Sequence, residues 1–345
     1  MVIPFQKKLL KARRFKKPFR IEENMTYTVK NQRKHRFPWG ILLGLAALIF
    51  VLLAVLSVNE IRNGNPGFLT NLWQVPDRYA DDPWLANNPD AIPVPNEVKT
   101  ILLLGSDYRP ELGYRTDVML LLGLNTRTNE VHLISFPRDL WVTIPGLGEQ
   151  RLNTAFPFGG WQGLSDTFAA NFGFRPDHYA MVDFQGFKHL IDVLDGIVVT
   201  VGEHMEDECH MNPSGWCVVE PGEVPMNSDE ALWYVRARLN SSDFDRTRRA
   251  QEVIQAMAKK AFQPSEILNL DNVIRAIFRT VETDMSVSDT ILYALPASKF
   301  VDMKFTTFRL TPDDAVPGTA YGGASVLFPN YPAIREKLLQ FYWIN

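Results

Sequence analysis

The longest apolar stretch of the chain is residues 37–58, FPWGILLGLAALIFVLLAVLSV, which contains no charged side chain. A helix needs about 20 apolar residues to cross a bilayer core, so this stretch predicts a single transmembrane helix. A helix packed in a globular core would carry a polar stripe, and this stretch has none. A cleaved signal peptide is the alternative, although the basic segment before the stretch is long and no Ala-x-Ala site follows it.

Shorter apolar runs after residue 97 predict the elements of a folded domain. Runs typical of strands covered on both faces occur at residues 98–105, 117–125 and 131–136, with a turn at TRTNE between the last two. Further strands are expected at 198–201 and 303–310. Helices are expected at roughly 163–172, 184–196, 248–262, 265–281, 288–295 and 332–343. This alternation predicts a three-layer α/β/α domain over residues 98–345.

Charge is distributed unevenly around the apolar stretch. Residues 1–36 carry twelve Lys and Arg against two Glu, a formal charge of +10, so the remainder carries −13 of the net −3. Cytoplasmic flanks of membrane spans are enriched in Lys and Arg, which predicts a cytoplasmic tail at 1–36 and an extracytoplasmic chain from residue 59 onward. Beside a membrane span, such a tail fixes topology and touches anionic lipid, and we expect no nucleic acid as partner.

Residues 59–97 are rich in Pro, Asn and Asp, a composition that favours turns and extended backbone, and they are interpreted as a stalk. Cys209 and Cys217 flank a Pro-Ser-Gly turn, and outside the cell such a pair predicts a local disulfide. A metal site formed by His204, Cys209, His210 and Cys217 is the rival hypothesis, but it lacks the Cys-x-x-Cys spacing typical of zinc motifs.

Charged residues follow the predicted strands directly. In GSDYRPELGYRTD, Asp107 leaves one strand and Arg115 and Asp117 enter the next, so a chain reversal brings the two carboxylates together. Paired carboxylates near an arginine suit Mg²⁺ bound with phosphate, because this cation prefers oxygen ligands and completes its shell with water and substrate. A salt-bridged loop explains the same pattern equally well. Arg138 in SFPRD and Arg151 before a glycine-bearing turn are further candidates.

The segment RARLNSSDFDRTRRAQE, residues 236–252, contains five arginines. The alternation of Arg236 and Arg238 predicts a strand that directs both side chains to one face. A helix is expected to follow, with Asp243 as its N-cap and Arg246 and Arg249 on a common face. Strand and helix arginines are thereby predicted to converge on a helix N-terminus.

Cations at a helix N-terminus oppose the helix dipole, which favours an anion at that place. The planar fork of arginine makes two charge-assisted hydrogen bonds with phosphate and does not deprotonate. The segment therefore predicts a phosphate or pyrophosphate site, with a solvated salt-bridge network as the alternative. The motifs of P-loop ATPases, serine hydrolases and zincins are absent from the sequence.

In these blocks the chain resembles the LytR-CpsA-Psr family of membrane-anchored cell-wall phosphotransferases. The resemblance is strongest over residues 100–262 and includes ILLLGSDYR, YRTDVMLLLGLN, LISFPRDLWVTIPG, RLNTAFPFGG and ALWYVRARLNSSDFDRTRRAQEV. It implies a domain with a mixed central sheet behind one transmembrane helix. The implied reaction transfers a glycan-1-phosphate from a polyprenyl-pyrophosphate carrier to a peptidoglycan hydroxyl, with Mg²⁺ at the pyrophosphate.

The resemblance also implies roles for individual residues. Asp107 and Asp117 would hold the metal, and Asp107 is alternatively the base toward the attacking hydroxyl. The implied pyrophosphate ligands are Arg115, Arg138, Arg236, Arg238, Arg246 and Arg249. Arg138, Arg246 and Asp107 are the expected catalytic residues.

One position departs from the family pattern. The family usually has Gln directly after the last of these arginines, whereas this chain has Ala250 there, followed by Gln251. That difference puts the family's glutamine contact in doubt. It also keeps open a non-catalytic function, that of an envelope protein or scaffold that binds polyprenyl phosphate. A pyrophosphatase that uses water as acceptor is a second enzymatic alternative.

Overall fold

The computed structural model describes residues 82, 85–86, 88–109, 113–128, 130–239, 242–261, 263, 270–286 and 304–344. All of them belong to the second of the two units into which the chain divides, Val75–Asn345. The predicted tail, the predicted membrane helix at 37–58, most of the predicted stalk and the predicted helix at 288–295 lie outside these residues. Within the described part, no helix has both the length and the apolar character needed to cross a membrane.

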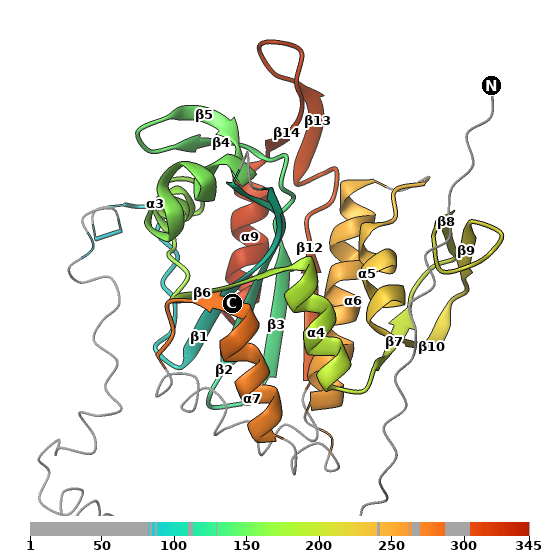
Figure 1. Cartoon of the computed structure of the whole chain (residues 1–345). Coiled ribbons are helices and arrows are strands. Elements are labelled where there is room, and N and C mark those ends of the chain that lie inside the picture. The colour runs from blue at the N-terminus through green and yellow to red at the C-terminus, as the bar shows by residue number, and fades with distance from the viewer. Residues whose placement is uncertain are drawn as a thin grey trace, which may run out of the picture. The chain divides into compact units, whose positions relative to one another are not determined.

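A six-stranded sheet forms the centre of the domain (Figure 1), with the strand order β11-β6-β1-β2-β3-β12. Neighbours pair antiparallel between β1 and β2, β2 and β3, and β11 and β6, whereas β1–β6 and β3–β12 pair parallel. The sheet is therefore mixed, as expected. The strands are β1 (Val98–Arg109), β2 (Gly113–Asn125), β3 (Glu130–Ser135), β6 (His178–Asp183), β11 (Val281–Thr283) and β12 (Lys304–Arg309).

Helices cover both faces of this sheet, which gives the three expected layers. On one face α3 (Ala155–Phe172) contacts β2 and α9 (Tyr331–Phe341) contacts β3. On the other face α4 (Phe184–Val193) contacts β1 and β6, and α6 (Asp243–Ala261) contacts β2, β3 and β12. Helices α5 (Ser228–Arg236) and α7 (Leu270–Thr280) pack against α4, and α5 also packs against α6.

Two apolar clusters hold the layers together. The core on the α3 side is aromatic, with Phe136 at its centre against Phe168 (ring centroids 4.9 Å apart) and Phe172 (5.1 Å). A second cluster joins α4, α5, α6 and α7 through side chains such as Ile191, Tyr234 and Val253. Burial of these side chains is the main force that holds the layers together, at about 25 cal/mol per Å² of apolar surface.

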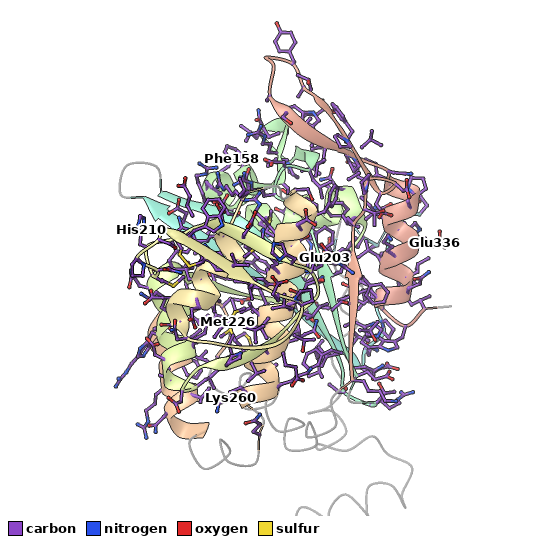
Figure 2. All side chains as sticks on the ribbon, turned by 90° about the vertical axis from the view of Figure 1, so that its right-hand side faces the viewer. Phe158, Glu203, His210, Met226, Lys260 and Glu336 are labelled. Atoms are coloured by element: carbon purple, nitrogen blue, oxygen red, sulfur yellow. A yellow bond between two sulfur atoms is a disulfide. The ribbon has the colours of Figure 1, made fainter. Side chains whose placement is uncertain are left out.

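Four two-stranded sheets surround the central layers. The hairpin of β8 and β9 carries the two cysteines, which form a disulfide with a Cα–Cα distance of 5.7 Å (Figure 2). The strands are β4 (Trp141–Ile144) with β5 (Gly148–Arg151), β7 (Ile197–Val201) with β10 (Gly222–Met226), β8 (Met205–Glu208) with β9 (Trp216–Val219), and β13 (Ala315–Thr319) with β14 (Ser325–Pro329).

The segment that contains Arg236 differs from the prediction, because it is the helix α5 and not a strand. Asn227 caps this helix in a capping box with Glu230, and both the side chain of Asn227 and that of Glu230 bond to backbone N–H groups of the first turn. Ala231 and Tyr234, three residues apart, point into the core. The alternation of Arg236 and Arg238 was therefore the wrong period, and the two arginines do not share a strand face.

Candidate active site

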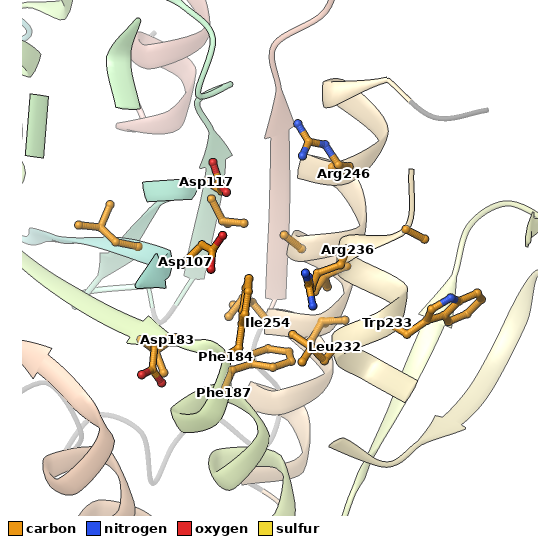
Figure 3. A pocket seen from close by; sticks show the side chains of 18 of the residues that line it. Asp107, Asp117, Asp183, Phe184, Phe187, Leu232, Trp233, Arg236, Arg246 and Ile254 are labelled. Carbon is orange, nitrogen blue, oxygen red and sulfur yellow. The ribbon is translucent and has the colours of Figure 1, made fainter. Parts of the chain in front are cut away.

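A cavity of about 780 Å³ lies between the central sheet and helices α4, α5 and α6. Its walls are largely apolar, with Leu103, Val118 and Leu120 from the sheet facing Phe187 of α4 and Ile254 of α6. Figure 3 shows that Phe187, Leu232 and Ile254 occupy the lower part of this view, and that Asp107, Asp117, Arg236 and Arg246 lie above them. The domain therefore offers a largely apolar chamber with charged groups on its wall.

A bulge between β1 and β2 places two carboxylates on this wall. The pairing shifts between Gly105, which faces Val118, and Ser106, which faces Thr116, so that Asp117 is the extra residue on β2. A bulge of this kind re-aims side chains, and here the consecutive residues Asp117 and Val118 both line the cavity. Asp107 lines it from β1, as the expected chain reversal requires.

Arg138 follows β3 and is held between two acids. Its Nη1 donates to Asp117 Oδ1 at 2.8 Å, and its Nε lies 3.4 Å from Asp139 Oδ2. Burial opposes the charge of the guanidinium, but the two carboxylates outweigh it and raise the pKa of Arg138. Arg115 is more exposed and lies 3.8 Å from Asp117 through Nη2. Both arginines line the cavity, as predicted from their motifs.

Arg236 and Arg238 reach the cavity from the end of α5. Arg236 is the last residue of that helix, and its guanidinium carbon lies 4.4 Å from the centre of the Phe184 ring, a cation–π contact. Arg238 lies in the connection to α6. Both line the cavity and both are exposed, so their donors remain accessible to a ligand.

Arg246 lies in the first turn of α6 and faces the cavity. Ser242 caps this turn, because its Oγ accepts from Asp245 N at 3.2 Å while Asp245 Oδ2 accepts from Ser242 N at 2.7 Å. The predicted cap, Asp243, is instead the first residue of the helix. Burial, together with the nearby positive charges of Arg138 and Arg238, lowers the pKa of Arg246 to about 10.

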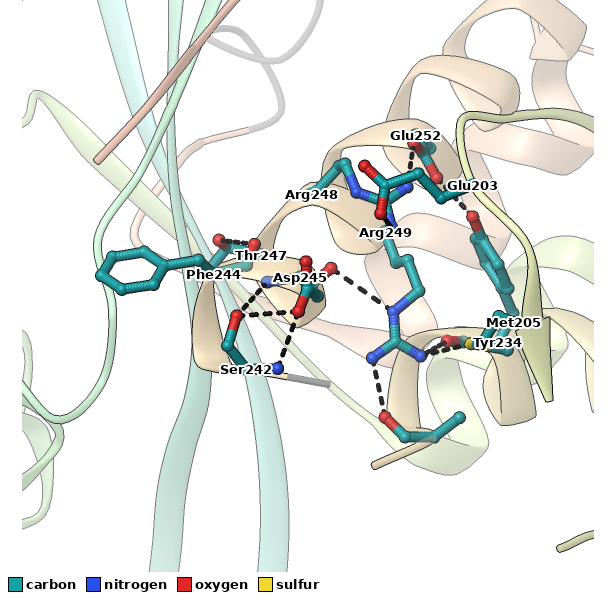
Figure 4. A network of polar contacts seen from close by, with 11 residues as sticks. Glu203, Met205, Tyr234, Ser242, Phe244, Asp245, Thr247, Arg248, Arg249 and Glu252 are labelled. Atoms are coloured by element: carbon teal, nitrogen blue, oxygen red, sulfur yellow. Dashed lines mark hydrogen bonds and ion pairs between the residues drawn. The ribbon is translucent and has the colours of Figure 1, made fainter. Parts of the chain in front are cut away.

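Arg249 takes a different place from the one predicted. It is 1% exposed and is not part of the cavity wall. Its Nη1 donates to the carbonyl of Tyr234 and its Nη2 to the carbonyl of Ala237, each at 2.7 Å (Figure 4). The prediction that Arg249 binds pyrophosphate is thus corrected to a buried role, in which its donors satisfy backbone carbonyls.

Three further residues of the sequence argument are placed by the structure. Ala250 lines the cavity one turn after Arg246. The side chain of Gln251 points elsewhere and donates to the carbonyl of Phe308 at 2.8 Å, so it does not replace the family glutamine. Arg151 is not part of the cavity wall, but its Nε lies 3.3 Å from Asp139 Oδ1, which links it to Arg138 through a shared acid.

The sequence argument missed the apolar wall and the β8–β9 hairpin. Phe184 and Phe187 belong to a predicted helix, but amphipathic helices that cover a packed core have the same pattern. The cavity is also lined by three residues at the β8–β9 hairpin, Asp207, Glu208 and His210. No local sequence motif predicted this. Asp139 was quoted within SFPRD without a role, although its neighbour Arg138 was a signal.

The carboxylates Asp107 and Asp117 fit the needs of Mg²⁺. They stand on one wall, on adjacent strands, and supply the oxygen donors that this ion combines with substrate phosphates and water. No cluster of three or more His, Cys, Asp or Glu suited to a metal occurs among the residues that the structure describes, and this finding includes the alternative site around His204. Two carboxylates are nevertheless the protein share typical of a Mg²⁺ site completed by phosphate.

Comparison with known proteins identifies the family. The LytR_cpsA_psr family profile matches residues 82–337, and the chain belongs to this family. The chain is 29% identical over 269 residues to the polyisoprenyl-teichoic acid–peptidoglycan teichoic acid transferase TagU of Oceanobacillus iheyensis, covering 75% of this chain and 81% of that protein.

Solved structures share the fold. The crystal structure of Bacillus subtilis TagV superposes with a TM-score of 0.61 at 23% identity and covers 72% of this chain and 98% of TagV. A structure described as TagT bound to LI-WTA gives a TM-score of 0.56 at 21% identity, with coverage of 72% of this chain and 92% of TagT. The mixed α/β fold of this domain is therefore shared with these solved structures.

Proposed function

We propose that this protein is a glycopolymer transferase, which moves a glycan-1-phosphate from a polyprenyl-pyrophosphate carrier to a hydroxyl of peptidoglycan. One observation carries the proposal. Guanidinium groups from four separate segments line one largely apolar cavity, namely Arg115 on β2, Arg138 after β3, Arg236 and Arg238 at the end of α5, and Arg246 on α6.

The charge of this group favours an anion with more than one negative charge. Arg246 is held near two other guanidinium groups, and its lowered pKa reflects their repulsion together with burial. A bound diphosphate would relieve that repulsion and accept several charge-assisted hydrogen bonds at once.

The apolar part of the cavity supports a lipid carrier. A prenyl chain has no hydrogen-bonding groups, so it can enter a chamber lined by residues such as Leu103, Phe187 and Ile254 without leaving a polar group unsatisfied. The volume of about 780 Å³ also falls within the range typical of ligand sites. The names of the relatives agree with such a substrate, since TagU is a polyisoprenyl-teichoic acid transferase and TagT is bound to LI-WTA.

The proposed reaction needs positioning and charge neutralisation more than covalent catalysis. The acceptor oxygen forms a bond to the phosphorus that carries the glycan, and the bond from this phosphorus to the bridging oxygen breaks, releasing polyprenyl phosphate. Arg138 and Arg246 would bind the diphosphate oxygens, on which charge increases. Asp107 would accept the hydroxyl proton or, with Asp117, hold Mg²⁺, which supplies further neutralisation of the diphosphate charge when bound.

The proposed location is the outer face of the cell membrane. The basic tail at 1–36 and the apolar stretch at 37–58 support a single-pass anchor with a cytoplasmic N-terminus. The disulfide between Cys209 and Cys217 agrees with an oxidising compartment.

An assay of the full-length protein in detergent tests the function. Incubation with a polyprenyl-pyrophosphate-linked glycan, Mg²⁺ and peptidoglycan oligomers is expected to yield a phosphodiester-linked product, and EDTA is expected to abolish it. Glycan phosphate released without peptidoglycan would indicate a pyrophosphatase instead. Bound polyprenyl phosphate without turnover would indicate a non-catalytic lipid-binding protein. Product formation that is unchanged in Arg138→Ala would contradict the proposed site.

A further inference from the structure

Residues 236–239 at the end of α5 are called here the arginine turn. They carry two of the cavity arginines, Arg236 and Arg238, and belong to no β-strand. The backbone of the turn leaves the helix at Ala237, whose φ of −54° and ψ of 141° are extended. Buried backbone groups in such a connection need partners from elsewhere in the fold. Two side chains of opposite charge, Arg249 and Asp207, supply these hydrogen-bond partners.

Arg249 supplies the donors. It donates to the carbonyl of Ala237 and to the carbonyl of Tyr234, at 2.7 Å each, from a position buried beneath the turn. Its Nε lies 3.3 Å from the carbonyl of Asp245, so the same guanidinium also contacts the first turn of α6. These bonds fix the end of α5 relative to the helix that carries Arg246.

Asp207 supplies the acceptor. Its Oδ2 accepts from the backbone N–H of Arg238 at 2.5 Å and of Leu239 at 3.2 Å. Asp207 stands on β8 directly opposite Cys217, and the disulfide closes the same hairpin two residues further on. Trp233 adds a second tie, because its Nε1 donates to the carbonyl of Glu208 at 3.0 Å. The hairpin is therefore fastened to α5 and to the arginine turn.

Asp207 is one of several carboxylates on the cavity wall, and its charge has an electrostatic consequence for ligand binding. Asp207 lines the cavity together with Arg238 and Arg246, where a negative charge should weaken the binding of a diphosphate. Burial opposes its ionisation, yet the three backbone N–H groups that it accepts from and the charge of Arg249 lower the pKa of Asp207. The carboxylate is thus charged and directed to the backbone of the turn.

We propose that Asp207 is a positioning residue for the donor pyrophosphate, which holds the arginine turn so that Arg236 and Arg238 face the cavity. The inference rests on the proposed function, because it assigns the turn to the diphosphate of the donor. The change in anion affinity on removing the Asp207 charge separates this role from an effect of the electric field alone. Removal of the Asp207 charge should strengthen anion binding through the field alone, but should weaken it if the turn loses its support.

The test measures binding of farnesyl pyrophosphate, a short prenyl diphosphate, to the full-length protein in detergent with Mg²⁺ by calorimetry. Asp207→Ala is expected to raise Kd at least tenfold. Asp207→Asn keeps one carbonyl oxygen as acceptor and is expected to fall between Asp207→Ala and the wild type. The matched control is Glu206→Gln, which removes the same charge one residue away, where the carboxylate accepts from Trp216 Nε1 of the same hairpin at 3.3 Å and does not line the cavity. Its Kd is expected to be unchanged or lower.

The outcomes separate the two ideas. Equal or tighter binding by Asp207→Ala, with a wild type that binds, overturns the positioning role and leaves the proposed function intact. A wild type that does not bind the diphosphate overturns both. If Asp207→Ala does not fold, the comparison of Asp207→Asn with Glu206→Gln decides, and equal Kd values for these two variants overturn the inference. When the donor is titrated in the transferase reaction, we expect Asp207→Ala to raise KM by a larger factor than it lowers kcat. We also expect Asp207→Asn to restore part of the wild-type KM, which is not expected of a residue that only maintains the fold.

Discussion

Arg246 and Arg249 are the same residue type on the same helix, three positions apart, yet the fold treats them in opposite ways. Arg246 faces the cavity among other cations, and its pKa is lowered to about 10. Arg249 is buried, and its guanidinium donates to the backbone carbonyls of Tyr234 and Ala237. Arg246 is thus placed to meet a ligand in the cavity, whereas the donors of Arg249 are used within the fold.

The same division extends along α6. On the cavity side Arg246 is followed by Ala250 and Ile254, which line the chamber. On the inner side Arg248 pairs with Glu252 at 2.8 Å, and Glu252 also accepts from the hydroxyl of Tyr234. One helix therefore presents a ligand-binding face and a face that ties it to α5 and β8. Substitutions on the two faces should affect different measurements.

Replacement of Arg246 by Ala should give the largest functional effect. We expect kcat/KM to fall by about 100-fold to 1,000-fold, the loss typical when one donor to a developing anionic charge is removed. The free energy of unfolding should be unchanged or raised, because burial and repulsion oppose the charge of Arg246 in the folded state. Lys259→Ala, an exposed charge removal on the same helix, is the control. Loss of folding in Arg246→Ala would show that this arginine is needed for the fold, which contradicts its assignment to ligand binding.

Replacement of Arg249 by Met should mainly cost stability. The variant keeps much of the buried volume but leaves the carbonyls of Tyr234 and Ala237 without their donor, so we expect a loss of about 2–4 kcal/mol in the free energy of unfolding. Urea denaturation of wild type, Arg249→Met and Arg246→Ala measures this directly. Equal stability of the first two would show that Arg249 does not act as a buried tie.

Replacement of Ala250 by Gln tests whether the cavity face of α6 contacts the diphosphate. The new amide would enter the cavity one turn after Arg246 and offer a hydrogen bond to the bound diphosphate, which is worth about 1 kcal/mol, or roughly fivefold in Kd. Calorimetry with farnesyl pyrophosphate measures the change, and Ala250→Leu controls for added volume. Weaker binding by both variants would show that this part of the wall contacts the prenyl chain instead.

Mild acid should give the smallest effect, a loss of stability. The pKa values of Asp207 and Asp245 are lowered from the ordinary value of 3.8, for although burial opposes their charge, hydrogen bonds from the backbone, and for Asp245 also from Ser242, outweigh it. Their contribution to stability is therefore complete above about pH 4 and is lost as the pH falls through the lowered values. Urea denaturation between pH 5 and pH 3 should show a weaker decline for Asp207→Asn than for wild type.

Much of the fold could be predicted from local sequence. The strands at 98–105, 117–125 and 131–136 and most of the described helices lie where the apolar runs placed them, because long apolar runs specify burial without reference to the rest of the chain. The arginines 138 and 246 reach the cavity as expected. The errors arose where two periods compete, as in LWYVRARL, which alternates like a strand but belongs mostly to the helix that starts at the capping box of Asn227 and Glu230.

The sequence by itself determined the inventory of the site: the carboxylates and the arginines, placed directly after strands and near a helix start. Tertiary structure alone decided which of these groups share a space. A bulge turned Asp117 and Val118 to one wall, and the packing of α5 and β8 around α6 enclosed Arg249 while leaving Arg246 open. Spacing along a helix fixes the angle between two side chains, but burial depends on what packs against each angle, and those partners come from distant segments.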